Sequence, residues 1–146
     1  MANMLFKIGL WGLGLSAILI GGALAFFGSH AVANFFASAI RVFHDVDVIS
    51  DLATPNIESE FRFFGVMFAF YGGVLIQTVK SLDLYASRVP ILLGVFFIAG
   101  LARLKGYIET GAPHELFTGL MAIEIGLPIL LFIFWRLRQK AHFTAA

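Results

Sequence analysis

The chain has 146 residues, of which 60% are hydrophobic and only 13% are charged, and its net charge is +1. A soluble domain carries about a quarter charged residues, so the composition excludes an ordinary water-soluble domain. The small net charge and the lack of a basic stripe exclude a nucleic-acid partner. The absence of cysteine excludes disulfides, thiolate nucleophiles and cysteine-ligated metals.

The first apolar run extends from residue 5 to residue 27 and is interrupted only by one lysine. It is longer than the roughly 7–15 apolar residues of a signal peptide, so we predict a retained membrane helix. The small-residue pairs Gly12/Ser16 and Gly21/Ala25 favour close packing against another helix. The alternative is that glycine is simply common in such helices.

Residues 29–60 are partly apolar and hold five acidic residues. Apolar side chains from Ala33 to Ile40 recur at helical spacing, which predicts an amphipathic helix lying at the membrane interface. The following "DLATPNIE" contains Pro55 and is predicted to be a loop, with Ser59 as a candidate cap of the next helix.

Three more spans are predicted at residues 61–79, 89–109 and 115–135. The third is purely apolar only up to Ala102 and must continue past Arg103 to cross a bilayer. The turn "ETGAPHE", with Gly111 as a helix stop, separates the last two spans. The chain is therefore predicted to be one domain, an all-α integral membrane four-helix bundle with an interfacial amphipathic helix between the first two spans.

Basic residues set the expected orientation. Six of the ten lie near the termini or in the loop 80–88, on one side of a four-span protein. Short loops rich in Lys and Arg stay in the cytoplasm, so both termini are predicted to be cytoplasmic. The C-terminal "WRLRQK" is predicted to be an interfacial anchor, with Trp135 at the level of the lipid headgroups.

Two charged residues interrupt the last two spans. From the helical rise of about 1.5 Å per residue, Arg103 lies roughly 10 Å and Glu124 roughly 13 Å below the outer surface. Because the two helices are antiparallel neighbours, these opposite charges fall at matching depth, and pairing would relieve much of the cost of burial. Arg62 could reach toward Glu124 or a bound anion, and Tyr71 could add a hydroxyl at mid-depth.

Three interpretations of these charges remain open. Polar side chains can fix the register of membrane helices, so the first is a structural salt-bridge network. The second is a polar cavity in the outer half of the bilayer that grips a lipid headgroup or an amphipathic small molecule. The third, a proton relay, is disfavoured because the inner half offers only Gln77 and Tyr71. The candidate ligand-binding residues are Arg62, Arg103, Glu124, Glu60, Tyr71 and His114.

Other chemistries receive little support. The four histidines lack the spacing of helix-borne metal sites, and no phosphate-binding loop or nucleophile elbow is present. His44, Asp45 and Asp47 could bind a metal, but a solvated acidic loop is the favoured interpretation. We therefore predict no metal and no cofactor.

The pattern "ESEFRFFGVMFAFYGG … GLARL … GAPHELF … MAIEIGLP" resembles a family of small bacterial inner-membrane proteins, the domain of unknown function 4345. The resemblance covers nearly the whole chain and implies four helices and a bacterial inner-membrane location. It is carried by the start of the second span, an arginine late in the third, the turn, and a glutamate in the fourth. The matching residues are Glu60, Arg62, Phe63, Arg103, Gly111, Pro113 and Glu124. The resemblance implies no reaction.

The leading functional hypothesis is a protein that binds a membrane lipid or a lipophilic small molecule through Arg62, Arg103 and Glu124. An accessory or scaffold subunit with a membrane protein partner is the alternative. A lipid-modifying enzyme with Glu124 as general acid or base is a third hypothesis, and it would need a nucleophile or metal that the sequence does not supply.

Overall fold

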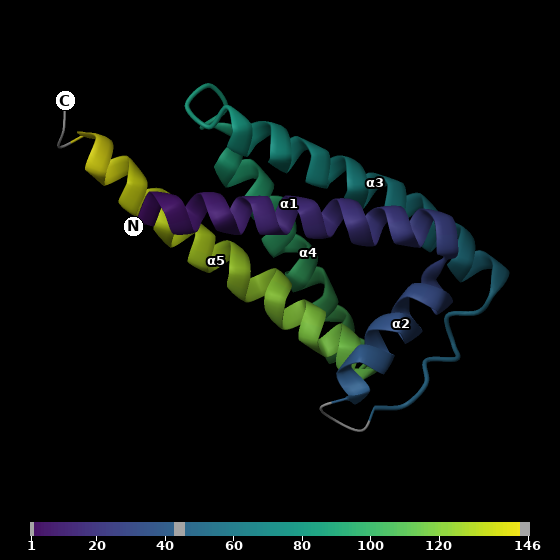
Figure 1. The fold of residues 1–146 in the computed structure, drawn as a ribbon. Coiled ribbons are helices and arrows are strands. Elements are labelled where there is room, and N and C mark those ends of the chain that lie inside the picture. The colour runs from purple at the N-terminus through teal and green to yellow at the C-terminus, as the bar shows by residue number, and fades with distance from the viewer. Residues whose placement is uncertain (1, 43–45, 144–146) are drawn as a thin grey trace.

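The computed structural model describes residues 2–42 and 46–143, and this part of the chain is helical without any strand (Figure 1). Four long helices are α1 (Ala2–Phe27), α3 (Pro55–Lys80), α4 (Arg88–Thr110) and α5 (Glu115–Phe143), and the shorter α2 (Ser29–Arg41) follows α1. Each long helix contains a stretch apolar and long enough to cross a membrane. The prediction of an all-helical fold with four long apolar helices is confirmed. His44 and Asp45 lie outside the described residues.

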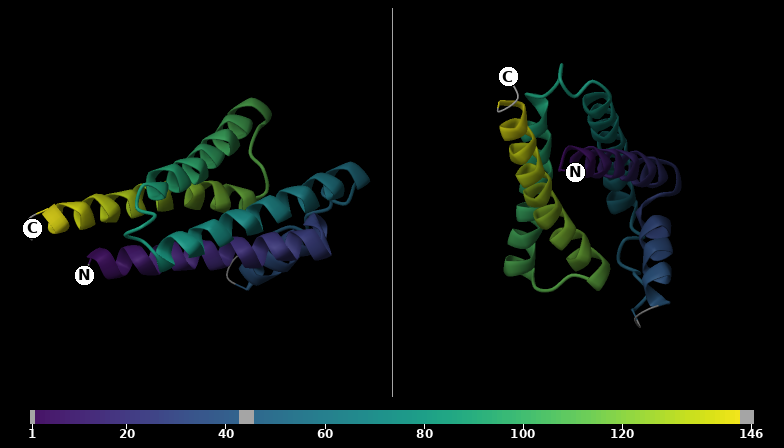
Figure 2. Two further views of the ribbon diagram at one scale, coloured as in Figure 1. Left: turned by 90° about the horizontal axis from the view of Figure 1, so that it is seen from above. Right: turned by 60° about the vertical axis from the view of Figure 1, so that its left-hand side comes forward.

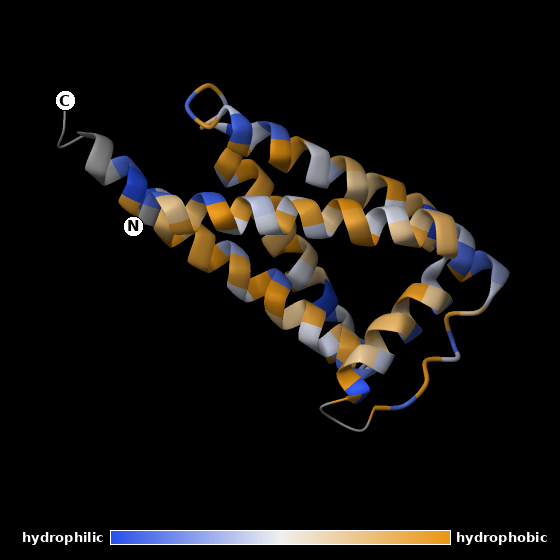
Figure 3. Ribbon diagram, viewed as in Figure 1, coloured by the Kyte–Doolittle hydropathy of each residue, from blue (hydrophilic) through white to orange (hydrophobic). Residues whose placement is uncertain are grey.

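Apolar residues dominate the long helices, and hydrophilic residues gather at helix ends and in connections (Figure 3). At one end of the molecule, which we call the termini end, lie the start of α1, the connection 81–87 and the end of α5 (Figure 1). At the other end, the α2 end, α2 runs from the end of α1 toward the start of α5 (Figure 1). This placement puts α2 across the ends of the long helices, and its location at a membrane interface stays a prediction.

The antiparallel pair α1 and α3 is held by glycines at seven-residue spacing on both helices. A Cβ atom at Gly72 would lie 2.5 Å from the carbonyl oxygen of Gly14, and one at Gly21 would lie 2.5 Å from that of Gly65. Only glycine permits such an approach of two backbones, which increases van der Waals contact between helices in lipid. The predicted small-residue contact is thus confirmed for Gly21, whereas a Cβ at Gly12 would meet nothing within 4 Å.

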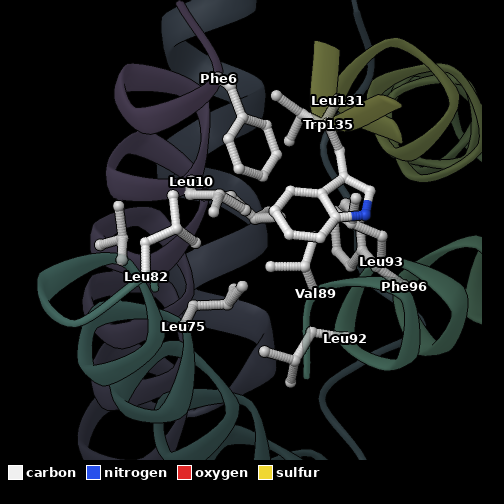
Figure 4. Close-up of a cluster of buried hydrophobic side chains, with 12 residues drawn as sticks. Phe6, Leu10, Leu75, Leu82, Val89, Leu92, Leu93, Phe96, Leu131 and Trp135 are labelled. Carbon is white, nitrogen blue, oxygen red and sulfur yellow. The ribbon is translucent and has the colours of Figure 1, made fainter. Parts of the chain in front are cut away.

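The pair α4 and α5 diverges from the pair α1 and α3. The helices α3 and α4 lie close together beside the connection 81–87 and separate toward the α2 end (Figure 2). The main hydrophobic cluster joins the two pairs on the termini side of the molecule (Figure 4). Its members are Phe6, Leu10, Leu13, Leu75, Val79, Leu82, Val89, Leu92, Leu93, Phe96, Leu131 and Trp135.

Trp135 belongs to this cluster and not to an interfacial belt. It is 3% exposed, and its ring centroid lies 5.6 Å from that of Phe6 in α1 (Figure 4). Arg138, one turn further, is also buried and pairs with Asp83 in the connection 81–87. The predicted anchor role of this segment is therefore wrong for Trp135 and Arg138, because α5 continues to Phe143 and packs both side chains against its neighbours.

Helix α3 begins six residues before the predicted second span. Pro55, predicted to be in a loop, occupies the first turn, and the Thr54 hydroxyl caps the helix by accepting a hydrogen bond from Ile57 N at 3.4 Å. Proline is tolerated there because the first amides of a helix have no partner within it. Thr54, and not Ser59, is the cap, and the extra turns place Glu58 and Arg62 against the α1–α2 junction.

Candidate functional site

The hairpin of α4 and α5 positions the two charges that the sequence singled out. Gly111 ends α4 with a φ of 97°, a backbone conformation that residues other than glycine rarely adopt. His114 then caps α5, since its Nδ1 accepts a hydrogen bond from Leu116 N at 3.1 Å. This short turn sets the register of the two helices and hence the height of Arg103 relative to Glu124.

Arg103 Nε donates a hydrogen bond to Glu124 Oε2 at 2.7 Å. This distance is typical of a charge-assisted bond between ions. Gly100 makes it possible by letting α4 approach α5, because a Cβ there would lie 3.0 Å from the Glu124 Cβ and 2.8 Å from Ile125. The prediction that Arg103 and Glu124 meet is confirmed. Their depth in a bilayer remains a prediction.

A pocket of about 290 Å³ opens beside this ion pair, where α3 and α4 have separated. It is lined by Leu52, Phe61, Arg103, Gly106, Tyr107, Thr110, Pro113, Phe117 and Met121. We call it the Arg103 pocket, because Arg103 carries the only charge among the described residues of its lining. The Arg103 side chain is 41% exposed and that of Glu124 only 11%, so a molecule in the pocket meets the guanidinium and not the carboxylate.

Three stacked aromatic rings join α3 to α4 closer to the termini end than the Arg103 pocket. Phe68 and Tyr71 of α3 lie with ring centroids 6.4 and 6.2 Å from that of Phe96 in α4. The Tyr71 hydroxyl donates to Leu92 O at 2.8 Å. Tyr71 therefore connects α3 to α4 at this position. Arg103 lies about two helical turns further along α4 than Phe96, toward the α2 end.

Arg62 lies elsewhere, at the junction of α1 and α2. Its Nη1 donates to the carbonyl oxygens of Ala25 and Phe26 at 2.9 and 3.0 Å, at the C-terminus of α1. The structure does not join it to Glu124. Glu60, two residues earlier, is exposed.

Glu58, which sequence reasoning did not single out, binds the other side of that junction. Its carboxylate accepts hydrogen bonds from Ser29 N and His30 N, both at 3.0 Å, and from the Ser29 hydroxyl at 3.2 Å. A carboxylate at a helix N-terminus satisfies free amides and interacts favourably with the helix dipole. Glu58 thus caps α2, and Arg62 caps α1 one helical turn away.

His114 connects the turn to the segment that follows α2. Its Nε2 lies 3.0 Å from Asp47 O, and because Nδ1 accepts from Leu116 N, Nε2 carries the proton and donates to this carbonyl. Asn34 of α2 binds both the amide and the carbonyl of Ile49, at 3.0 and 2.8 Å. These bonds hold residues 46–52 in place, and Leu52 forms part of the pocket wall.

Of the six predicted site residues, the structure brings Arg103 and Glu124 into direct contact. It places Tyr71 closer to the termini end than that ion pair. Arg62, Glu60 and His114 lie outside the pocket lining. Sequence reasoning missed the apolar walls, although Phe117 and Met121 precede Glu124 by seven and three residues. That spacing places them on one face of a helix with Glu124 and could have revealed them.

A second groove of about 290 Å³ lies between α4 and α5. It is lined by Pro90, Leu93, Gly94, Phe97, Pro128, Ile129, Phe132 and Ile133, none of which carries a charge. No group of three or more His, Asp or Glu residues within 2–42 and 46–143 is placed to hold a metal ion. The Arg103 pocket is thus the stronger candidate, because it combines apolar walls with a charged hydrogen-bond donor.

Fold and site together define a protein of the multi-pass membrane class, with four long apolar helices and a pocket at one end of its helix pairs. The chain belongs to the family of the domain of unknown function DUF4345, whose model matches residues 5–135. No curated protein and no solved structure matches the chain. The family resemblance expected from the sequence is thus confirmed, and it leaves the function to be inferred from the site.

Proposed function

We propose that this protein binds a lipophilic or amphipathic small molecule in the Arg103 pocket. The observation that carries the proposal is the placement of Arg103 in a pocket whose other described lining residues are uncharged, while its counter-ion Glu124 is more deeply buried. Ligand sites are mostly apolar concavities with a few well-placed polar groups, and this pocket has that composition. Phe61, Phe117 and Met121 supply the apolar surface.

The volume of the pocket limits what it accepts. Pockets for drug-sized ligands span about 300–1,000 Å³, and the Arg103 pocket, at about 290 Å³, lies at the lower limit. It suits the polar head of an amphipathic molecule better than a complete lipid. The pocket lies where α3 and α4 diverge toward the α2 end (Figure 2), and Phe61 and Tyr107 line it from the two helices.

The proposal also includes the orientation of the protein in a membrane. We place α1, α3, α4 and α5 across a plasma membrane, the α2 end outside and both termini in the cytoplasm. Lys80, Arg88 and Arg138 lie toward the termini end, on α3, α4 and α5, which agrees with the preference of basic residues for the cytoplasmic side. In this orientation the pocket faces the outer leaflet.

Native mass spectrometry after purification in a mild uncharged detergent tests the proposal. Gly106 lines the pocket, and a Cβ there meets nothing within 4 Å, so Gly106→Leu is chosen to occupy the pocket. Gly119→Leu is the matched control, because Gly119 is equally free of neighbours and lies outside the lining. We expect a bound small molecule in the wild type and in Gly119→Leu, and its loss in Gly106→Leu.

The same spectra separate this proposal from the alternative of a scaffold subunit. A scaffold predicts a protein partner that survives in all three samples and no small molecule that depends on Gly106. Retention of the same small molecule by Gly106→Leu and by the wild type would contradict binding in the Arg103 pocket.

A further inference from the structure

The Arg103 pocket offers a ligand several hydrogen-bond donors at a site whose charge is already balanced. The guanidinium of arginine has five N–H donors. Within the described part of the chain, the one hydrogen bond found for Arg103 uses Nε and goes to Glu124. The four N–H groups on the two Nη atoms remain for a ligand. The positive charge, in contrast, is matched by the Glu124 carboxylate 2.7 Å away.

Two further ionisable groups close in sequence to the pocket lining, Lys105 and His114, have partners within the protein. Lys105 pairs with Glu109 at 2.8 Å, one helical turn apart on the exposed side of α4. Both ring nitrogens of His114 are engaged, since Nδ1 accepts from Leu116 N at 3.1 Å and Nε2 lies 3.0 Å from Asp47 O. The Lys105 ammonium, like the Arg103 guanidinium, is therefore matched by a carboxylate.

We propose that the pocket selects an uncharged headgroup with oxygen acceptors, such as the ester and hydroxyl oxygens of a glyceride or the carbonyl of a ketone. This inference rests on the proposed function and specifies its ligand class. A neutral oxygen accepts hydrogen bonds from the Arg103 Nη groups without adding charge. An anionic headgroup would add a second negative charge next to Glu124, and uncompensated charge is costly in a medium of low dielectric constant. A cationic headgroup would meet the exposed guanidinium and be repelled.

Three amphiphiles with the same ten-carbon tail test the ligand class: 1-decanoylglycerol, decyl phosphate and decyltrimethylammonium. Their dissociation constants are measured with the purified full-length protein in nanodiscs of zwitterionic lipid. For the wild type we expect the glyceride to bind at least about tenfold more tightly than either ion, which corresponds to one decade in the dissociation constant. A wild type that binds decyl phosphate as tightly as the glyceride, or more tightly, overturns the inference.

Glu124→Gln provides the second arm of the test. The variant keeps a hydrogen-bond acceptor for Arg103 but removes the compensating charge, so we expect decyl phosphate to become the preferred ligand. Asp83→Asn removes the carboxylate of another arginine ion pair, with Arg138 at the termini end of the molecule and outside the pocket lining, and should leave the wild-type order of the three ligands unchanged. An unchanged order in a folded Glu124→Gln variant contradicts the inference. If Glu124→Gln fails to fold, the wild-type order alone decides.

The failure of this inference can be told apart from the failure of the proposed function. If none of the three amphiphiles binds in a way that Gly106→Leu abolishes, the proposed function itself is contradicted. If binding depends on Gly106 but favours decyl phosphate, the pocket is a binding site and only the inferred ligand class is wrong.

Discussion

Glu58 and Arg62, one turn apart on α3, cap the facing ends of two successive helices. Glu58 accepts the first amides of α2, and Arg62 donates to the last carbonyls of α1. Their own side chains approach to 3.8 Å. This arrangement fixes the bend at Gly28 and so sets the direction in which α2 crosses the ends of the long helices.

The capping role of Glu58 predicts a local effect on α2. Glu58→Ala should increase the hydrogen-exchange rates of the first amides of α2 by about tenfold, because a lost helix cap costs about 0.5–2 kcal/mol. Hydrogen–deuterium exchange with mass spectrometry on peptides covering residues 29–41 measures this. Glu60→Ala, two residues away and exposed, is the control. Equal protection of α2 in both variants would refute the cap.

Gly28 is expected to tolerate alanine less well than Gly111. Both residues have a positive φ, 84° and 97°, in a region that costs other residues about 1–3 kcal/mol. A Cβ at Gly28 would also strike the Glu58 carboxylate, whereas one at Gly111 meets nothing within 4 Å. Thermal unfolding in detergent should show a larger loss for Gly28→Ala. A Glu58→Ala background should reduce that loss to the level of Gly111→Ala, and full additivity of the two substitutions would contradict the contact.

The glycine contacts between α1 and α3 give a test on two adjacent residues. Gly72→Ala should destabilise the protein by about 1–3 kcal/mol, the usual effect of overpacking. A Cβ at Gly72 has the Gly14 carbonyl 2.5 Å away, and one at Gly73 has nothing within 4 Å. Gly73→Ala should therefore change the free energy of unfolding by less than about 0.5 kcal/mol. Titration with sodium dodecyl sulfate in mixed micelles measures both, and similar values for the two variants would exclude the proposed packing.

The hydrogen bond from Tyr71 to Leu92 O predicts that Tyr71→Phe lowers the free energy of unfolding by about 1 kcal/mol. The same titration measures the effect. Tyr107→Phe is the matched control, because no hydrogen bond of the Tyr107 hydroxyl is found within the described residues. If both substitutions are neutral, the Tyr71 bond does not hold α3 to α4.

Helical periodicity and rise were sufficient to predict the four long helices and the meeting of Arg103 with Glu124. Both rest on local rules: an apolar stretch of sufficient length requires a helix, and a short turn makes the next helix an antiparallel neighbour. The positions of Trp135 and Arg138 depend instead on contacts with Phe6 and with Asp83, 55 residues away along the chain. No pattern within α5 specifies those partners.

The role of Arg62 was difficult to predict for a related reason. A charged residue near the start of a span can bind a ligand, an ion partner or a helix end, and the sequence does not distinguish these. Arg62 binds the end of α1 because the C-terminus of α1 lies beside it. The position of that C-terminus relative to α3 depends in turn on the glycine register between the two helices. The start of α3 was predictable in principle, since Thr54 followed by Pro55 is a known signal for a helix N-terminus.

Photo-crosslinking is the most direct test of binding in the Arg103 pocket. A decanoylglycerol carrying a diazirine beside its headgroup is irradiated with the wild type, with Gly106→Leu and with Gly119→Leu, and the labelled peptides are identified by mass spectrometry. The account predicts labels concentrated between residues 103 and 121 and at Phe61 in the wild type and in Gly119→Leu, and their loss in Gly106→Leu. Labels spread evenly over the lipid-facing surfaces, and unchanged by Gly106→Leu, would contradict it.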